Sequence, residues 1–400
     1  MKLKRLQDAK VKGEKVLLRV DFNVPLKGKK VADDTRIVQT LPTIKYLLQQ
    51  KAKIILVSHL GRPDGKKANS LSLKPVAAVL SRLLKKPVKK LNECIGPQVQ
   101  KVVNAMKPGD IILLENVRFH KEEEKNNTAF AKKLASLAEV YVSDSFGTAH
   151  RAHASTHAVA KYLPAYAGLL MQKEVHALAP LFEKTRHPLT LIVGGAKIDT
   201  KIGILHNFIT RADYFLIGGG LANTFLAAEG FDVGKSLYER KKIEVAQEIM
   251  LEAESFRENV VLPEDVVVAD EIGENVVTAD IPVEDVEGNM KILDLGKNTL
   301  KKFLKIIQKS RVIIWNGPVG LFEYKPFKKG TSAIARMLAG LKRKGVQTII
   351  GGGDTIEAIN KFGLSEKKFT HVSTGGGAML EFLEGKMLPG IEILLEKKRK

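Results

Sequence analysis

The sequence contains little cysteine and no long apolar run. Its 400 residues include a single cysteine, Cys94, which excludes an intrachain disulfide bond and a metal site built from several cysteines. No apolar run approaches the roughly 18 residues that a membrane-spanning helix needs, and the basic start Met1–Arg5 is not followed by an apolar signal segment. Together these absences predict a protein of the reducing cytoplasm.

Acidic residues are scarce in the first half of the chain. Residues 1–170 contain 32 Lys and Arg against 14 Asp and Glu, a net charge of +18, whereas residues 171–400 contain 33 against 30, a net charge of +3. This asymmetry indicates that the first half binds an anion, either a small polyanionic metabolite or a nucleic acid. No RRM, KH or helix-turn-helix signature supports the nucleic-acid alternative. Solvated lysines explain part of the charge, and we expect Lys85, Lys86, Lys89 and Lys90 to be of that kind.

Several common signatures of nucleotide-binding proteins are missing. Gly230–Ser236 resembles a P-loop, but it has three residues between its glycines instead of four and follows a helical run. Gly218–Asn223 lacks the third glycine of the dinucleotide fingerprint, which argues against a dehydrogenase. The H-R-D and D-F-G motifs of protein kinases are absent as well. The sequence therefore excludes an ordinary P-loop NTPase and a protein kinase.

Short apolar runs alternate with helix-like segments, the pattern of parallel sheets with crossover helices. The strand-like runs are Val16–Val20, Ile54–Val57, Ile111–Leu114, Val140–Val142, Leu189–Val193, Tyr214–Ile217, Val312–Trp315, Val346–Ile350 and Phe369–Val372. The expected helices of the first half are Thr40–Gln50, Pro75–Leu84 and Thr128–Ala138. Residues 263–300 lack a clear period, and we expect strands there with an irregular insert.

An amphipathic segment, residues 161–186, joins the two halves. Met171–Phe182 has helical character, with Pro180 bending the helix or lying near its end. We therefore place a domain boundary here, with an N-terminal domain at 1–170 and a C-terminal domain at 171–387. A connecting helix of this kind could serve as a hinge.

Polar and charged side chains follow the strands of the first half. They are Asp21 and Asn23, His59 and Arg62, Arg118, and His150 and Arg151, with Arg36 following the first of these strands at a distance. In parallel α/β sheets, ligands bind outside the carboxyl ends of the strands, so these groups should face one crevice. Guanidinium groups match carboxylate and phosphate geometry, and the crevice is therefore predicted to bind a small polyanion. A surface ion pair or a turn is the alternative for any one of these residues.

Glycines follow five strands of the second half. The runs are Gly194–Gly195, Gly218–Gly220, Gly317, Gly351–Gly353 and Gly375–Gly377. Glycines at a common crevice let the backbone approach a phosphate or nucleotide closely, although a tight turn explains any single run. After the fourth run, Asp354 or Thr355 could cap a helix whose N-terminal end favours an anion.

Two lysines and one aspartate of the second half suit phosphate chemistry. Lys197 and Lys201 could neutralise a transferring group; the alternative is that they are solvated. A cation is unfavourable at a helix start, which favours the functional interpretation. Asp354 is a natural Mg²⁺ ligand, because Mg²⁺ prefers few carboxylates together with phosphate oxygens. A half that binds an anion and a half that binds a nucleotide imply phosphoryl transfer between two bound ligands.

Eight segments, spread in family order over nearly the whole chain, resemble motifs of the phosphoglycerate kinase family. They are Asp21–Pro25, Ser58–Pro63, Glu115–Phe119, Gly147–Ala154, Gly194–Lys197, Trp315–Pro318, Gly351–Thr355 and Ser373–Ala378. The resemblance implies two doubly wound, Rossmann-like α/β domains joined by a hinge helix, with residues 388–400 returning to the N-terminal domain. It also implies a monomeric glycolytic enzyme that transfers a phosphoryl group between 1,3-bisphosphoglycerate and ADP, giving 3-phosphoglycerate and MgATP, in line and after hinge closure.

The resemblance further implies roles for individual residues. Phosphoglycerate would be bound by Asp21, Asn23, Arg36, His59, Arg62, Arg118 and Arg151. The nucleotide would be bound by Lys201, Asn316, Glu323, Gly352, Gly353, Asp354 and Thr355. Of these, Glu323 would hold the ribose hydroxyls and Asp354 the Mg²⁺. The transferring phosphoryl group would be steadied by Arg36, Lys197 and the amides of Gly375 and Gly376.

Overall fold

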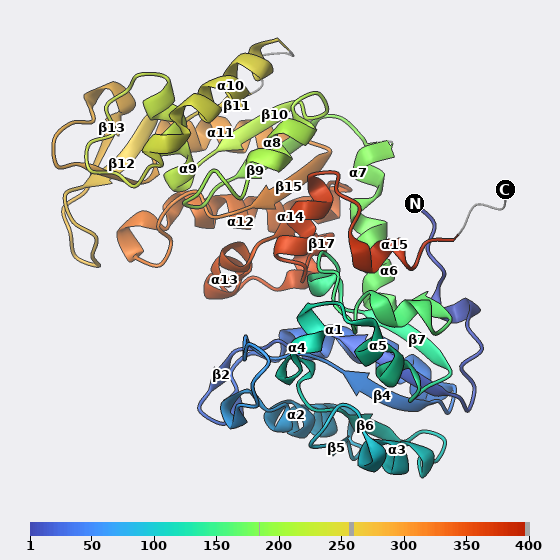
Figure 1. Ribbon diagram of the computed structural model, residues 1–400. Helices are drawn as coiled ribbons and strands as arrows, with labels where there is room; N and C mark the ends of the chain where they lie inside the picture. Colours follow the sequence, from blue (N-terminus) through green and yellow to red (C-terminus); the bar gives the residue numbers. More distant parts are fainter. Residues whose placement is uncertain (184, 256–259, 397–400) are drawn as a thin grey trace. The chain divides into compact units, whose positions relative to one another are not determined.

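The computed structural model describes residues 1–183, 185–255 and 260–396, which form two compact units (Figure 1). The first unit comprises Met1–Ala179 together with Met387–Lys400, and the second comprises Pro180–Lys386. The division follows helix α6 (Leu169–Leu178) and coincides with the start of α7 (Pro180–Glu183), whereas the sequence analysis placed it near residue 170. Pro180 separates the two helices, since its ring cannot continue the hydrogen bonding of α6.

A six-stranded parallel sheet forms the centre of the first unit, as the alternating pattern predicts. Its strand order is β5-β6-β4-β1-β7-β8. The strands are β1 (Lys15–Val20), β4 (Lys53–Val57), β5 (Lys89–Lys90), β6 (Ile111–Leu113), β7 (Val140–Asp144) and β8 (Ala165–Ala167). The helices are α1 (Thr35–Gln49), α2 (Lys74–Leu84), α3 (Pro97–Asn104), α4 (Lys121–Glu124), α5 (Thr128–Ala135), α6 and α15 (Pro389–Glu392). A small hairpin joins β2 (Leu26–Lys27) to β3 (Lys30–Val31).

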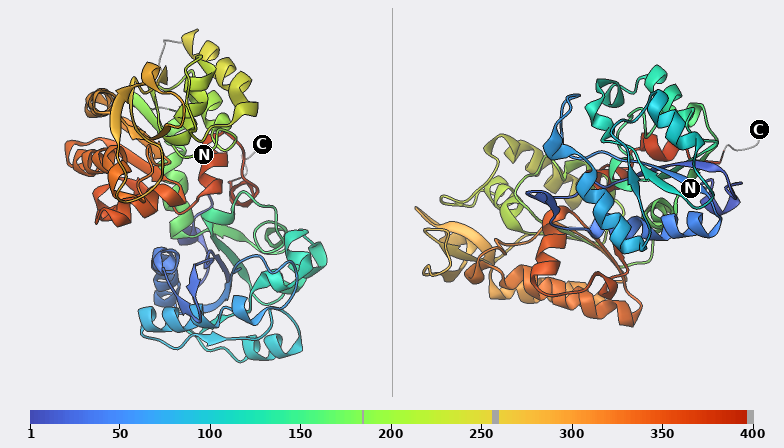
Figure 2. Two further views of the ribbon diagram at one scale, coloured as in Figure 1. Left: turned by 90° about the vertical axis from the view of Figure 1, so that its left-hand side faces the viewer. Right: turned by 90° about the horizontal axis from the view of Figure 1, so that it is seen from below.

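Both faces of this sheet are covered, which accounts for its continuous apolar strands. Val16 and Leu18 of β1 pack in one core with Ile44 of α1, while Leu17, on the opposite face, is 1 % exposed. Successive side chains of a strand point to opposite faces, so burial at adjacent positions requires cover on both sides. Figure 2 shows helices flanking the sheet.

The end of the described chain packs on the first unit. The Lys4 amide donates to the Leu394 carbonyl at 2.8 Å, and the Gly390 amide donates to the Ala149 carbonyl at 2.8 Å. The sequence analysis expected residues 388–400 to return to this part of the molecule. Residues 397–400 lie outside the described residues.

The second unit repeats this architecture with a parallel sheet ordered β11-β10-β9-β15-β16-β17. Its strands are β9 (Leu189–Val193), β10 (Tyr214–Ile217), β11 (Val260–Val261), β15 (Val312–Asn316), β16 (Gln347–Gly351) and β17 (His371–Val372). Its helices are α7, α8 (Ile202–Phe208), α9 (Gly219–Ala228), α10 (Ile243–Glu254), α11 (Lys297–Lys309), α12 (Lys329–Leu341), α13 (Gly353–Lys361) and α14 (Gly377–Leu383). The strand order reverses between β9 and β15, and such a switch point opens a crevice at the carboxyl ends of the strands.

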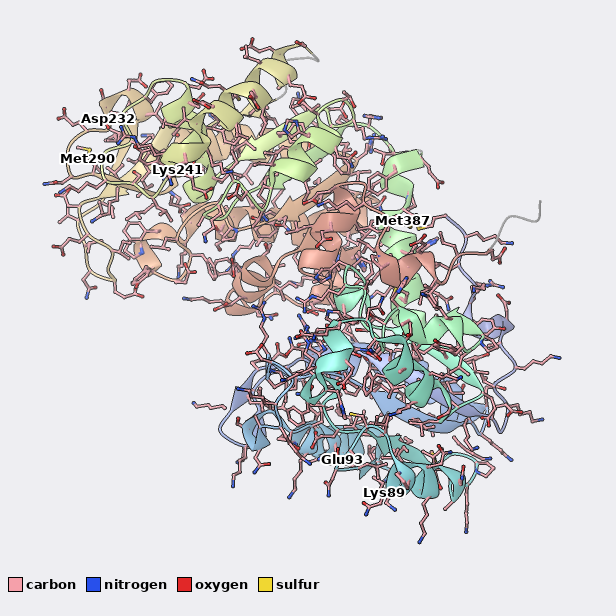
Figure 3. All side chains as sticks on the ribbon, viewed as in Figure 1. Lys89, Glu93, Asp232, Lys241, Met290 and Met387 are labelled. Atoms are coloured by element: carbon pink, nitrogen blue, oxygen red, sulfur yellow. The ribbon has the colours of Figure 1, made fainter. Side chains whose placement is uncertain are left out.

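The segment that lacked a clear period forms a separate antiparallel sheet. Strands β13 (Ala279–Pro282), β12 (Asp265–Ala269) and β14 (Lys291–Leu295) pair in that order. The loop after α9 joins its edge, where the Lys235 amide donates to the Met290 carbonyl at 2.8 Å. Figure 3 labels Asp232 and Met290 in this region. The sequence predicts strands here but not their pairing, because residues 263–300 lack a clear period.

The expectation that Lys89 and Lys90 are both solvated is wrong for Lys90. Lys89 is exposed on the surface (Figure 3). Lys90 instead pairs with the carboxylate of Glu115, and the two side chains are only 14 % and 5 % exposed. Neighbouring positions of β5 point to opposite faces, so a solvated Lys89 places Lys90 inward. Among the described residues, no helix is long and apolar enough to cross a membrane.

Candidate ligand sites at the two sheet edges

The first site begins where β1 ends. Arg36, in the first turn of α1, donates from Nη1 to Oδ2 of Asp21 at 2.7 Å. The Asp21 side chain is 9 % exposed and the Arg36 side chain 36 % exposed, so the guanidinium group keeps an accessible face. A charge-assisted bond of this kind holds the arginine in position without covering it.

Gly61 joins the loops that follow three neighbouring strands. Its amide donates to Oδ1 of Asn23 at 2.9 Å, and its carbonyl accepts from Nη1 of Arg118 at 2.8 Å. Gly61 has a φ of +63°, a conformation that favours glycine. The residues that the sequence analysis placed after β1, β4 and β6 are thus brought together by one backbone position. Arg62, next in the chain, is exposed.

The histidines of this site are uncharged. Burial and the neighbouring Arg19 lower the pKa of His59 well below its ordinary value. Burial and Arg151 lower the pKa of His150 to about 4. Nε of Arg151 donates to Nε2 of His150 at 3.0 Å, which also requires an unprotonated nitrogen there. At neutral pH the positive charge of the site therefore belongs to its arginines.

A buried hydrogen-bond network adjoins His59 of the site, and it was not identified from the sequence. Arg19 is 1 % exposed, and its Nε donates to Oγ of Ser155 at 2.8 Å. Ser155 in turn donates to Oε1 of Glu123 at 2.6 Å. The Nη2 atom of Arg19 lies 3.3 Å from Nδ1 of His59. A signal was present, because an arginine inside a fully apolar strand must find buried polar partners.

The second site forms at the switch point of the second unit, where two glycine loops touch. A Cβ atom on Gly194 would lie 2.1 Å from the Pro318 carbonyl oxygen, and one on Gly317 would lie 2.2 Å from the Gly194 oxygen. Gly317 also has a φ of +97°. Only glycine allows the loops after β9 and β15 to approach this closely. The other three glycine runs follow strands of the same parallel sheet and reach the same edge.

Lys201 and Asn316 form the buried polar part of this site. Nζ of Lys201 donates to Oδ1 of Asn316, and both side chains are buried. Burial lowers the pKa of Lys201 to about 8, while the nearby Asp354 acts in the opposite direction. Within the part of the chain that the structure describes, Nδ2 of Asn316 has no hydrogen-bond partner. The Lys201 ammonium group can bind an anion, and Nδ2 of Asn316 can donate to an acceptor atom.

The structure corrects the expected cap of α13. Gly352, with a φ of +92°, occupies the N-cap position, and no side chain caps the helix. Thr355 instead accepts a hydrogen bond from the Gly317 amide through Oγ1 at 2.7 Å, so it links two glycine loops. Asp354 and Gly353 are exposed in the first turn. The expectation that Asp354 or Thr355 caps this helix is therefore wrong.

The residues expected at the transferring phosphoryl group have different surroundings. The Lys197 side chain is exposed in the loop after β9. The Gly375 amide donates to Oγ of Ser373 at 3.0 Å, so this donor has an internal partner. Gly376 has a φ of +51° and directly precedes α14. All three belong to loops at the carboxyl edge of the sheet.

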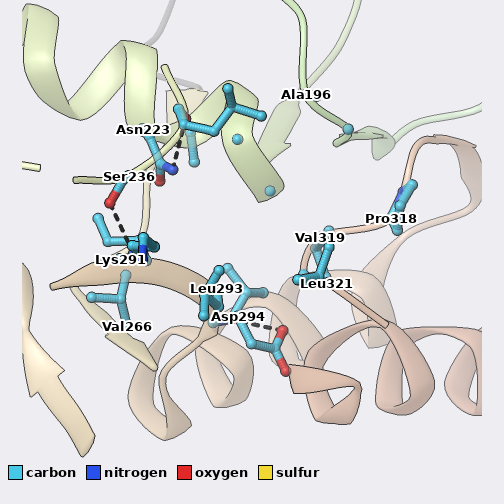
Figure 4. A pocket seen from close by; sticks show the side chains of 18 of the residues that line it. Ala196, Asn223, Ser236, Val266, Lys291, Leu293, Asp294, Pro318, Val319 and Leu321 are labelled. Carbon is cyan, nitrogen blue, oxygen red and sulfur yellow. Dashed lines mark hydrogen bonds between the residues drawn. The ribbon is translucent and has the colours of Figure 1, made fainter. Parts of the chain in front are cut away.

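A cavity of about 510 Å³ opens beside the glycine loops (Figure 4). Glycines of the loops that follow β9 and β10 form one wall of the cavity, and the small antiparallel sheet forms another wall. The lining includes Gly220, Asn223, Leu237, Val266, Glu323 and Asp354. Glu323 and Asp354 are thus two expected nucleotide ligands that the cavity brings together, whereas Lys201, Asn316 and Thr355 do not line it.

Asp294 lines the same cavity and was not identified from the sequence. It is 2 % exposed, and its carboxylate accepts from the amides of Leu295 and Gly330 at 2.9 Å each. Burial raises the pKa of Asp294 to about 7. The carboxylate joins β14 to the start of α12 and so fixes the cavity wall. Among the described residues, no group of three or more His, Cys, Asp or Glu could hold a metal ion.

Comparison with known proteins gives one consistent result. The family model described as phosphoglycerate kinase matches residues 6–386. The chain is 50% identical over 397 residues to the phosphoglycerate kinase of Pelotomaculum thermopropionicum, with 99% of this chain and 100% of the relative covered. It is 52% identical over 392 residues to that of Dictyoglomus turgidum, with 98% of each covered. The solved structure of phosphoglycerate kinase from Coxiella burnetii matches with a TM-score of 0.88, 42% identity and 98% coverage of each chain.

Proposed function

Because this chain belongs to the phosphoglycerate kinase family, we propose which of its residues carry out the family's reaction. Enzymes of this family catalyse ATP-generating phosphoryl transfer in glycolysis. The phosphoryl group passes from 1,3-bisphosphoglycerate to ADP, and the products are ATP and 3-phosphoglycerate. The bond from phosphorus to the carboxyl oxygen breaks, and a bond from phosphorus to the terminal ADP oxygen forms.

The first unit is proposed to bind phosphoglycerate. The proposed ligands are Asp21, Asn23, Arg36, His59, Arg62, Arg118 and Arg151. The observation that carries this proposal is the gathering of Arg36, Arg118 and Arg151 around His59, whose pKa burial and these charges lower. Arginine forks in a fixed arrangement suit a ligand with one carboxylate and one phosphate.

The second unit is proposed to bind the nucleotide in its cavity. Glu323 would accept from the ribose hydroxyls, and Lys201 with Asn316 would meet the phosphates. Gly352, Gly353 and Thr355 would complete the phosphate site. The Glu323 carboxylate and the glycine-lined wall of the cavity support this assignment. ADP and ATP are the substrates that the family uses.

Transfer is proposed to proceed in line, without a protein nucleophile, after the hinge closes. Arg36, Lys197 and the amides of Gly375 and Gly376 would stabilise the charge of the transferring group. Phosphoryl transfer depends mainly on positioning and charge neutralisation, which these groups provide. For Gly375, the amide would have to leave Ser373 Oγ.

Mg²⁺ is proposed to accompany the nucleotide and to be held by Asp354. The side chain is exposed in the first turn of α13 and lines the cavity, and it is the kind of single carboxylate that Mg²⁺ uses beside phosphate oxygens. When bound, the ion neutralises phosphate charge. We further propose a cytoplasmic monomer whose partners are these small molecules.

A coupled assay tests the function directly. Purified protein with ATP, Mg²⁺ and 3-phosphoglycerate should form 1,3-bisphosphoglycerate, detected through its reduction by an added NADH-dependent dehydrogenase. Omitting 3-phosphoglycerate should abolish the signal. A folded preparation without activity would contradict the proposal.

A further inference from the structure

A buried arginine beside the first site is held at each of its three guanidinium nitrogens. Arg19, in β1, is 1 % exposed. Its Nε donates to Oγ of Ser155 at 2.8 Å, and its Nη1 donates to the Val20 carbonyl. Its Nη2 lies 3.3 Å from Nδ1 of His59, in the loop that follows β4. The guanidinium group therefore has a fixed orientation, with one N–H directed at the imidazole ring.

Glu123 holds the serine of this network in place. Oγ of Ser155 donates to Oε1 of Glu123 at 2.6 Å, and the Ser155 amide donates to Oε2 of Glu123 at 2.9 Å. A hydroxyl group that donates to a carboxylate keeps a lone pair, so it can accept from Arg19 at the same time. Both Glu123 and Ser155 are buried. Because all of these polar groups are buried, turning Arg19 away would leave several of them without partners.

Arginine can only donate, and this fixes the position of the proton on His59. A guanidinium group has five N–H donors and no acceptor, and it stays protonated in proteins. Nδ1 of His59 must therefore accept from Nη2 of Arg19. Burial and the nearby arginine charges lower the pKa of His59, so the ring has a single proton at neutral pH. With Nδ1 acting as the acceptor, that proton lies on Nε2.

Nε2 of His59 is the ring nitrogen that is left for a ligand. In the part of the chain that the structure describes, it has no hydrogen-bond partner, and it is not among the unpartnered side-chain atoms that are fully buried. This atom therefore keeps accessible surface. The charges of Arg36, Arg118 and Arg151 act on the same ring, so His59 lies among the arginines that are proposed to bind the anion.

We propose that Arg19 is a positioning residue that holds His59 as the Nε2–H tautomer, so that Nε2 donates a hydrogen bond to an oxygen of the anion bound in the first site. In the other neutral tautomer Nε2 would be an acceptor, and its lone pair would repel a carboxylate or phosphate oxygen. Arg19 is covered by the protein and acts only through His59. This inference rests on the proposed function, because it requires phosphoglycerate to bind beside His59.

Nitrogen NMR of the ligand-free protein tests the tautomer. Proton–nitrogen correlation spectra of protein labelled in histidine distinguish a protonated ring nitrogen from an unprotonated one, and the signal lost in His59→Leu identifies His59. At neutral pH the proton should lie on Nε2. Nδ1 should resonate upfield of a free acceptor nitrogen, because it accepts from Arg19. A proton on Nδ1, or an Nδ1 signal at the position of a free nitrogen, would overturn the inference.

A double-mutant cycle tests whether Arg19 acts through His59. Arg19→Met should weaken the binding of 3-phosphoglycerate by about tenfold, the effect expected when one hydrogen bond to a charged ligand is weakened. In the His59→Leu background the same substitution should change the affinity by at most about twofold, because the ring that Arg19 orients is absent. Calorimetric titration measures the four affinities. Equal losses in both backgrounds would reveal a general effect of charge or folding and overturn the inference.

A matched control separates orientation of the ring from damage to the unit. Lys90, in β5, is another little-exposed cation of the same sheet, and it pairs with Glu115 instead of a histidine. Lys90→Met should leave the Nδ1 signal of His59 unchanged, whereas Arg19→Met should move it toward the position of a free nitrogen. If Arg19→Met does not fold, the spectrum of the wild-type protein decides the inference by itself.

The outcomes also distinguish this inference from the proposed function. A proton on Nδ1 of His59, together with phosphoryl transfer from ATP to 3-phosphoglycerate, would overturn the role of Arg19 alone. Absence of both 3-phosphoglycerate binding and phosphoryl transfer in the folded wild-type protein would overturn the proposed function, and with it the donation from Nε2 to that anion.

Discussion

In the first site, arginines supply the positive charge and histidines supply uncharged hydrogen-bonding groups. His59 is buried and His150 is half-buried, and the lowered pKa of each makes it a neutral hydrogen-bonding group. Arg36 retains an accessible guanidinium face while Asp21 holds it in place. Such an arginine can contact both a bound anion and a transferring phosphoryl group.

Replacing Arg36 tests this role. Arg36→Ala should lower the turnover number by about 100-fold to 1,000-fold, because one preorganised donor to the transition state is lost. Steady-state kinetics measure the turnover number, and calorimetry should show an unchanged affinity for MgADP. Turnover close to the wild-type value would show that Arg36 does not act on the transferring group.

Asp354 offers a separate test in the second unit. Asp354→Ala should weaken the binding of MgADP by about tenfold or more, since a charge-assisted contact to the metal is removed. The affinity for 3-phosphoglycerate should stay the same, because its proposed ligands belong to the other unit. The readout is calorimetric titration with each ligand, and an unchanged MgADP affinity would exclude the metal role.

The lowered pKa of Lys201 predicts a pH dependence. Burial lowers this pKa to about 8, so in the ligand-free protein the side chain loses its proton as the pH rises above that value. Binding of an anionic phosphate favours the charged form, and the affinity for ADP should fall above pH 8 by up to about tenfold per pH unit.

Lys201→Arg provides the matched control, because its guanidinium group stays protonated over the whole range. Affinity of this variant should be nearly independent of pH between about 7 and 9.5. The measurement is a series of ADP titrations in buffers of constant ionic strength. A wild-type affinity that does not change over this range would show that Lys201 does not contact the phosphates.

At the scale of elements, the approach of two glycine loops determines the second site. Gly317→Ala should destabilise the second unit by at least about 2 kcal/mol, because the residue has a positive φ and its Cβ would collide with the Gly194 oxygen. Urea denaturation followed by tryptophan fluorescence measures this. The single tryptophan, Trp315, donates from Nε1 to the Gly317 carbonyl at 2.8 Å and so reports on this loop.

Gly340 gives the control for the same substitution. It lies in α12, and a Cβ atom there would meet no atom within 4 Å. Gly340→Ala should leave the free energy of unfolding unchanged or raise it by up to about 1 kcal/mol, since alanine favours helix. Equal effects of both substitutions would show that the close approach at Gly317 is not the cause.

At the scale of the whole molecule, the net charge of +21 favours a monomer. Light scattering should give the mass of one chain from about 1 to 100 µM protein, because like charge on the copies opposes their association. A mass of two chains at the higher concentrations would contradict the expected monomer. The nucleic-acid alternative for the basic half stays a hypothesis, and steeply salt-dependent binding would be its mark.

The sequence by itself determined most strands of the two parallel sheets and the edges at which their polar residues and glycines lie. Strands β9 and β10 were predicted with their observed bounds, since each is a short apolar run that ends at glycine. Because the carboxyl ends of parallel strands share one edge, residues as distant as Asp21 and Arg118 could be assigned to one crevice. This inference needs only the strand pattern and the parallel pairing.

Only the tertiary structure decided which atoms meet. The hydrogen bonds of Gly61, which accepts from Arg118 and donates to Asn23, and the burial of Arg19 beside Ser155 depend on side-chain packing between distant segments. Such contacts follow from the shape of the folded core, because a polar atom is satisfied or left unsatisfied only by what packs around it. Local sequence does not carry that information.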